Sequence, residues 1–152
     1  MTAEHPDQEL YSLIVEQAPD AVVLADRDGA IRLWNAAAEA LFGYSAAEAI
    51  GQTLDILVPE RFRQAHWAGF DRALASGETK YARQVLPARS ANKGGDTIYV
   101  AMTLSVLRDE AKQVIGVLAI LRDMREQRDR ERALGQRVAE LERQARTSPS
   151  PG

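Results

Sequence analysis

The alternating stretch from Thr97 to Leu107 (TIYVAMTLSVL) constrains the fold more than any other part of this sequence. Apolar side chains recur at every second position, which is typical of a β-strand that is buried on one face. The face predicted to be buried consists of Ile98, Val100, Met102, Leu104 and Val106. A strand of this kind belongs in a sheet, so the rest of the sequence must supply partner strands and a layer that covers the apolar face.

Further strands are predicted on both sides of a helical middle part, at Ala21–Ala25, Ile31–Trp34, Lys80–Arg89 and Gln113–Leu121. The first two flank Asp26–Ala30, a turn rich in aspartate and glycine, and are expected to form a hairpin. Pro87 interrupts the third, which indicates a sheet edge or a bulge because proline cannot donate a ladder hydrogen bond. Helical spacing predicts helices in the middle part at Ala36–Leu41 and Pro59–Ala75, and the capping box Ser45–Glu48 opens another short helix that Gly51 ends.

This order of elements predicts an α+β domain with a five-stranded antiparallel sheet and helices on one face. An amphipathic helix at residues 9–18 precedes the domain, which spans residues 19–122, and a highly charged, coiled-coil-like helix follows it at residues 123–146. Residues 1–8 are expected to be mobile and residues 147–152 disordered, because both segments are polar and contain proline.

The composition excludes several classes of function. The chain of 152 residues contains no cysteine, which rules out disulfides, zinc–thiolate sites, iron–sulfur clusters and cysteine catalysis. Its net charge of −3 argues against a general nucleic-acid role. No apolar run reaches the length of a membrane span, and the acidic N-terminus lacks the features of a signal peptide, so the expected location is the cytoplasm. The sequence contains no serine–histidine–aspartate set, phosphate loop or pair of catalytic carboxylates, and the chain is not expected to be an enzyme.

One titratable side chain lies on an apolar helix face. In the predicted helix Pro59–Ala75, Phe62, His66 and Phe70 recur at helical spacing and therefore share a face. Gly69 lies beside His66 and would allow a flat, bulky group to approach the helix closely. A cavity is expected between this face and the apolar face of the long strand. An imidazole there either ligates heme iron or is an ordinary half-buried histidine that bonds a backbone carbonyl.

Residues Asn35–Tyr44 (NAAAEALFGY) resemble the N-x-A-x-x-x-L-F-G-Y signature of PAS domains. The hairpin Lys93–Asp96 and the end of the last strand, Leu121–Asp123, are also similar to that family. The resemblance covers about Gln8 to Glu126 and implies the PAS fold. The next residues, Met124–Arg125, depart from the aspartate–isoleucine–threonine ending that is common in the family.

Within PAS domains, Leu57–His66 (LVPERFRQAH) is similar to the heme-binding PAS domains of rhizobial oxygen-sensing histidine kinases and of the direct oxygen sensor phosphodiesterase. The resemblance implies heme b as the cofactor and His66, three residues after Arg63, as the proximal iron ligand. It implies a propionate contact for Arg72, with Lys80 in the place of a propionate-side histidine. The opposite wall of the pocket that it implies consists of Leu86, Met102 and Leu104, with the small residue Ala119 on the last strand, and Phe62, Gly69 and Phe70 complete the candidate pocket.

The distal side decides which gas such a heme would sense. The rhizobial sensors place an arginine at the position of Leu86 to hold bound oxygen, whereas an apolar distal side favours carbon monoxide or nitric oxide. Met102 lies across the predicted cavity from His66, and its thioether either occupies the sixth coordination site of the iron or only fills core space. Flavin photochemistry of the LOV type needs an adduct-forming cysteine, so the sequence argues against it and leaves a non-covalently bound flavin as a third alternative.

The C-terminal helix predicts self-association through a short heptad seam, Leu134, Val138, Leu141 and Ala145. Burying six such side chains contributes about 9–18 kcal/mol, and association costs about 4–15 kcal/mol, so the helix alone is expected to dimerise only weakly. The domain body and the apolar side of the N-terminal helix are expected to complete a homodimer, the latter through Leu10, Leu13 and Ile14.

These observations lead to two hypotheses. The first is a homodimeric sensor that binds heme through His66 and has oxygen, carbon monoxide or nitric oxide as its gas ligand. It relays the state of the iron to the C-terminal helix and to a downstream output domain or partner protein. The second is a PAS module for dimerisation and relay whose core is empty or holds a small metabolite, in which case His66 is structural.

Overall fold

The computed structural model describes residues 8–147 of the chain. The terminal segments that the sequence predicts to be mobile or disordered fall outside the described residues, apart from one residue of each. Those two residues, Gln8 and Thr147, are helical, so the flanking helices reach one residue closer to the chain ends than predicted, although on the domain side the first ends at Gln17 and the last begins at Arg125.

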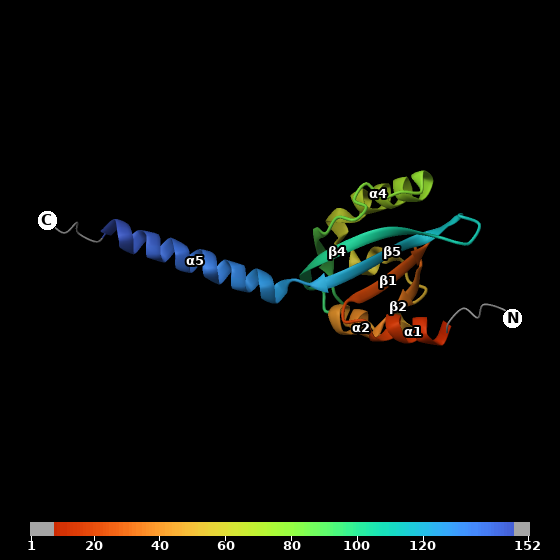
Figure 1. Ribbon diagram of the computed structural model, residues 1–152, viewed down its shortest axis with the longest axis horizontal. Coiled ribbons are helices and arrows are strands. Elements are labelled where there is room, and N and C mark those ends of the chain that lie inside the picture. Colours follow the sequence, from red (N-terminus) through yellow and green to blue (C-terminus); the bar gives the residue numbers. More distant parts are fainter. Residues whose placement is uncertain (1–7, 148–152) are drawn as a thin grey trace.

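Five strands form one antiparallel sheet in the order β2-β1-β5-β4-β3, which confirms the predicted architecture (Figure 1). The strands are β1 (Ala21–Asp26), β2 (Ile31–Trp34), β3 (Leu86–Ala91), β4 (Thr97–Arg108) and β5 (Val114–Asp123). The outer strands are β2 and β3, so Pro87 lies on an edge strand, where its missing N–H interrupts no central ladder.

Strand β3 begins later than predicted. The sequence predicts a strand from Lys80, but residues 79–84 form turns closed by local backbone hydrogen bonds. Within them Arg83 has a φ of 63°, in the left-handed region. Since the backbone groups of this segment find partners locally, they do not pair with β4, and the ladder starts only at Leu86 opposite Met102.

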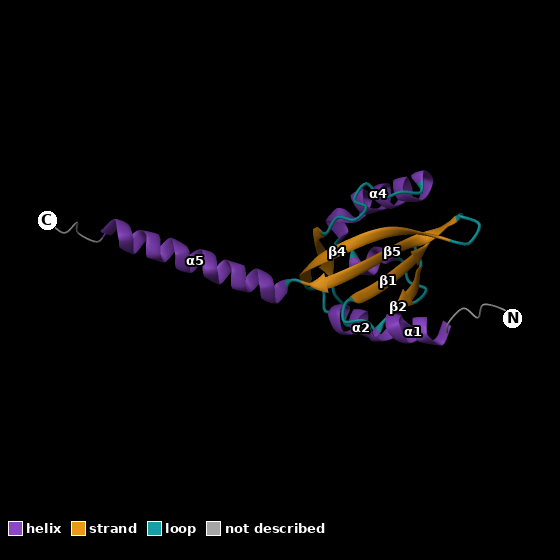
Figure 2. Cartoon of the chain, in the orientation of Figure 1, coloured by secondary structure: helices purple, strands orange, loops and turns teal. Residues whose placement is uncertain are grey.

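Helix α4 lies on one side of the sheet, α1 and α2 lie together on the other side, and α5 extends away from the domain (Figure 2). They are α1 (Gln8–Gln17), α2 (Ala36–Phe42), α3 (Ala46–Ala49), α4 (Arg63–Ser76) and α5 (Arg125–Thr147), with two short 3₁₀ turns, η1 (Leu54–Leu57) and η2 (Glu60–Phe62). The helix predicted from Pro59 therefore starts as a 3₁₀ turn and becomes α-helical only at Arg63. Gly77 ends α4 with a φ of 72°, as a glycine beyond the last turn predicts. None of the helices from Gln8 to Thr147 is long and apolar enough to cross a lipid bilayer.

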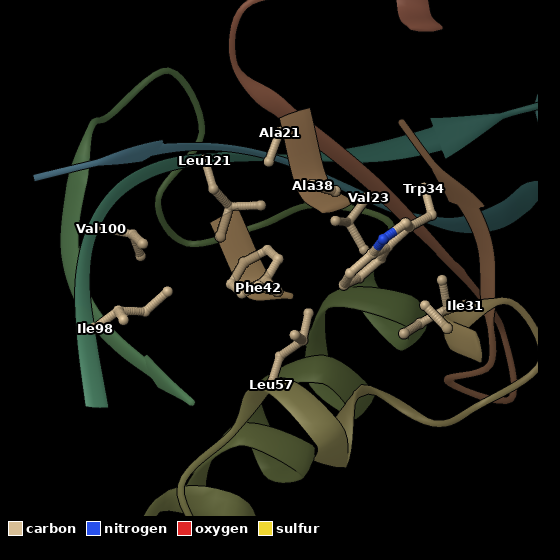
Figure 3. Close-up of a cluster of buried hydrophobic side chains, with 11 residues drawn as sticks. Ala21, Val23, Ile31, Trp34, Ala38, Phe42, Leu57, Ile98, Val100 and Leu121 are labelled. Atoms are coloured by element: carbon tan, nitrogen blue, oxygen red, sulfur yellow. The ribbon is translucent and has the colours of Figure 1, made fainter. Parts of the chain in front are cut away.

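The core lies between one face of the sheet and the short helices that follow β2 (Figure 3). Ile98 and Val100 of β4 are each 1% exposed, which confirms the predicted buried face for the first part of that strand, whereas Met102, Leu104 and Val106 of the same face are only half-buried. They face Phe42 of α2, which is fully buried and lies 5.4 Å from the ring of Trp34. The short helices therefore cover the face of the sheet on which Ile98 and Val100 lie, as expected from the alternation of apolar residues in β4.

Asn35 joins α1, β1 and α2. The side-chain oxygen of Asn35 accepts from the amides of Val22 (2.9 Å) and Ala38 (3.0 Å), and the second of these bonds caps α2. The side-chain nitrogen donates to the carbonyls of Val15 (2.8 Å) and Asp20 (3.0 Å). Asn35 is 1% exposed, so one buried amide side chain satisfies four backbone groups, and its bonds to Val22 and Ala38 are fully buried.

Candidate functional site

His66 lies on α4 and is half-buried. Its ring is stacked at 28° to the buried ring of Phe70, with centroids 6.2 Å apart, and meets the ring of Trp67 edge-on at 5.0 Å. The Nδ1 atom of His66 is buried and makes no hydrogen bond within the part of the chain that the structure describes. A buried ring nitrogen without a hydrogen-bond partner destabilises the folded state, so stability does not explain why a histidine occupies this position.

Burial lowers the pKa of His66 below its ordinary value of 6.5, and the nearby carboxylate of Asp55 opposes this shift only in part. The imidazole is therefore neutral in a neutral solution. A neutral imidazole can offer a lone pair to a metal, whereas an imidazolium cannot.

Trp67 connects the N-terminal half of α4 to η1 and to the turn between β1 and β2. Its indole Nε1 donates to Oδ1 of Asp55 in η1 at 2.7 Å, and its ring lies directly against Gly29 in the turn between β1 and β2. Arg63, one turn earlier, donates to the carbonyl of Val58 at 3.1 Å. These contacts hold the helix that carries His66, and sequence reasoning did not identify them because Trp67 and Gly29 are distant in the chain.

Replacing Gly29 with alanine tests this attachment. Gly29 has a φ of 80°, and a Cβ there would overlap the ring of Trp67. The matched control is Gly95→Ala, because Gly95 has a φ of 85° and nothing within 4 Å of the added Cβ. Both variants pay for the left-handed backbone, so we expect Gly29→Ala to lose about 1–3 kcal/mol more stability in urea denaturation than Gly95→Ala. Equal losses would show that Trp67 does not pack tightly against this turn.

The sheet brings the predicted residues of the opposite wall together. Leu86 pairs with Met102, and Leu104 pairs with Ala119, so these four side chains project from the same face of β3, β4 and β5. Met102 and Ala119 pack against the hydrophobic core, and all four are half-buried. Helix α4 packs on β5, the strand that carries Ala119.

Three of the predicted pocket residues are exposed. Phe62 is 37% exposed and lies under the guanidinium of Arg61, 4.7 Å from its ring centroid. The prediction that Phe62 shares the face of His66 and Phe70 assumed a continuous α-helix, but η2 winds as a 3₁₀ turn and alters the phase. Lys80 is exposed because its segment forms a turn, and Arg72 is exposed on α4.

Two features of α4 are compatible with a bound heme: a ring nitrogen that could ligate iron, and an open helix surface beside it. His66 presents a neutral, buried ring nitrogen without a partner. A Cβ added at Gly69 would meet only the guanidinium of Arg72, at 3.8 Å, so the helix surface beside His66 is open. Two surface pockets, of about 340 and 300 Å³, lie elsewhere, beside α1 and beside α2.

The sequence of residues 9–124 matches the family model described as the PAS fold. The chain belongs to the PAS family. The structure explains the PAS signature at residues 35–44 in physical terms, since Asn35 forms the buried cap described above and Ala38 and Phe42 fill the core. Gly43 ends α2 with a φ of 83°, and the carbonyl of Tyr44 accepts from the indole of Trp34.

Several relatives of this PAS domain are sensor proteins. It is 49% identical over 53 residues to the sensor protein FixL of Bradyrhizobium diazoefficiens, covering 35% of this chain and 10% of that protein. It is 27% identical over 121 residues to the oxygen sensor protein DosP of Escherichia coli, covering 80% of this chain and 15% of that protein. A PAS domain structure from Colwellia psychrerythraea, 25% identical, superimposes with a TM-score of 0.65 over 75% of this chain and 93% of that one. The chain thus spans only a small part of its curated relatives.

The pKa of His66 predicts how stability depends on pH. An unfolded histidine binds a proton as the pH falls through about 6.5, whereas the buried ring of the folded state resists protonation. The unfolded state then binds more protons, so the stability of the folded state falls as the pH falls below that value. We expect His66→Leu to remove this part of the pH dependence, measured as the free energy of unfolding at pH 7.5 and at pH 5.5. An unchanged difference between the two pH values would contradict the assigned burial.

Proposed function

We propose that this PAS domain is a sensory domain that binds heme through His66 and relays the state of the iron to α5 in a homodimer. The observation that carries the proposal is the buried Nδ1 of His66, which has no partner within the described residues. The sequence around His66 supports it independently, because it resembles that of heme-binding PAS sensors.

Each candidate residue has a defined part. His66 would hold the iron through a ring nitrogen, and the cationic side chains of Arg72 and Lys80 are free to turn toward the propionates. Leu86, Met102, Leu104 and Ala119 would form an apolar wall that excludes water. The heme would supply an iron that binds oxygen, carbon monoxide or nitric oxide, and Leu86 in place of a polar donor favours the last two.

The relay begins where β5 runs into α5. The carboxylate of Asp123 accepts from the amide of Arg125 at 2.9 Å and forms an ion pair with its guanidinium at 2.7 Å. The amide of Met124 donates to the carbonyl of Tyr99 in β4 at 2.8 Å, and the guanidinium of Arg128 lies 3.8 Å from the centroid of the Tyr99 ring. A displacement of β4 would therefore move the first turn of α5. The domain binds and relays, and a downstream domain or partner carries the activity that it controls.

Titration of the heme-free chain with hemin tests the proposal. We expect a Soret band that saturates at one heme per chain, with a shifted maximum after reduction and addition of carbon monoxide. Protein that stays colourless after gel filtration would exclude the heme sensor.

A second function is supported by the filling of the core. Phe42 is fully buried and Leu57 is 8% exposed, and both lie between the sheet and the helices (Figure 3). A core that side chains fill in this way suits a PAS module that dimerises and relays motion without heme. A colourless chain that remains dimeric would favour this second function.

A further inference from the structure

Helix α4 has little buried apolar surface to hold it on the domain. Of its 14 residues, Phe70 is the one whose side chain is buried. Its first half is connected to the domain through Trp67, which bonds Asp55 and packs on Gly29. The last two turns, after Phe70, need a different attachment to keep the face that carries His66 at a fixed distance from β5.

Arg108 makes a contact at that end of the helix. It is the last residue of β4, at a point where the ladder with β5 shifts register, and such a shift can redirect a side chain. Its guanidinium donates from Nη2 to the carbonyl of Gly77, the residue that ends α4. It also donates from Nη1 to the carbonyl of Lys112 in the turn between β4 and β5, at 3.2 Å. A Cβ added at Gly77 would overlap the guanidinium, so the end of α4 and Arg108 are in direct contact.

The charge of Arg108 complements the C-terminal end of α4. The last carbonyls of a helix have no partners within the helix, and together they carry a partial negative charge. A lysine or arginine in the last turn commonly compensates this charge, but α4 has no basic residue there. Arg108 therefore supplies, from a neighbouring strand, the cation and the donor that the sequence of the helix lacks. A guanidinium suits this role because its N–H groups point in fixed directions and can bond two carbonyls at once.

We propose that Arg108 is a positioning residue for the candidate heme site. It holds the C-terminal half of α4 against the turn between β4 and β5, while Trp67 holds the first half. Without Arg108, the part of the helix after Trp67 would move away from β5 and widen the space beside Phe70. The consequence for heme rests on the proposed function, whereas the attachment of α4 is a property of the heme-free chain.

The place of this attachment separates the retention of heme from the ligation of iron. Gly77 lies about three helical turns beyond His66, and Trp67 holds the helix directly beside His66. The imidazole therefore stays in place when Arg108 is lost, whereas the surface formed by Gly69 and Phe70 is no longer held near the sheet. Loss of Arg108 is expected to accelerate the release of heme and to leave its protein ligand unchanged.

Amide hydrogen exchange of the heme-free chain tests the attachment. We expect Arg108→Gln to speed the exchange of the amides of residues 73–77 by at least about tenfold, because the end of the helix loses a donor and a cation. The matched control is Arg27→Gln, because Arg27 is also exposed but donates to the carbonyl of Val114 at 3.0 Å rather than to α4. Equal exchange in the two variants, or no change in Arg108→Gln, would overturn the proposal.

Transfer of heme to an excess of apomyoglobin tests the consequence for the site. We expect Arg108→Gln to lose heme at least about fivefold faster than both the natural chain and Arg27→Gln, with an unchanged Soret maximum because His66 still ligates the iron. A shifted maximum or an unchanged rate would overturn the role of Arg108 at the heme site. A natural chain that binds no heme would contradict the proposed function instead, and the exchange experiment would still decide whether Arg108 holds α4.

Discussion

Replacement of His66 by alanine is expected to abolish the Soret band in a hemin titration and to weaken heme binding by at least about 100-fold. The reason is that His66 is the one histidine on α4, and the other ring nitrogen of that helix, the indole Nε1 of Trp67, is a donor without a lone pair for a metal. His5→Ala is the matched control, because the chain has two histidines and His5 precedes the segment that matches the PAS family. We expect that variant to bind heme like the natural chain.

The loss of binding must be separated from a loss of folding. Nδ1 of His66 makes no hydrogen bond within the described residues, so the alanine variant gives up packing against Phe70 and Trp67 but no hydrogen bond from that atom. We therefore expect its free energy of unfolding without heme to fall by no more than about 1–2 kcal/mol. A folded His66→Ala variant that keeps a full Soret band would falsify the assignment of the ligand.

Replacement of Asn35 by alanine is expected to cost about 3–5 kcal/mol of stability, the largest structural effect that we expect from a single residue. The substitution leaves two buried amides without an acceptor and two carbonyls without a donor, and it removes the cap of α2. Each unsatisfied group costs about 1–3 kcal/mol and the cap about 0.5–2 kcal/mol, with partial relief where water enters. Urea denaturation followed by circular dichroism measures the difference.

Two further variants separate the contributions of this side chain. Asn35→Asp keeps both acceptor bonds but loses both donors, and it places a carboxylate beside the carbonyls of Val15 and Asp20, so it is also expected to be destabilising. Ser45→Ala removes only the exposed cap of α3 and should cost about 1 kcal/mol. If Asn35→Ala costs no more than Ser45→Ala, the four hydrogen bonds do not hold the three elements together.

Local patterns in the sequence were sufficient for most of the architecture. The alternation in β4 identified Ile98 and Val100 as buried, and the capping box at Ser45 is present with both of its hydrogen bonds. These features depend on side-chain spacing and on neighbours within one turn, so they can be predicted from the sequence without knowledge of the tertiary structure. The start of β3 and the first turn of α4 were wrong for the opposite reason: the local turns at residues 79–84 and the 3₁₀ turn before Arg63 carry no periodic signal.

The candidate site divides in the same way. The sequence by itself determined that the chain folds as a PAS domain and that a histidine lies on the helix before the long strands, because spacing and motif fix both. Only the tertiary structure decided that Nδ1 of His66 is buried without a partner, that Trp67 rests on Gly29, and that Phe62 is exposed. Burial and contact between distant segments depend on how helices and sheet pack in three dimensions, and no pattern along the chain records that packing.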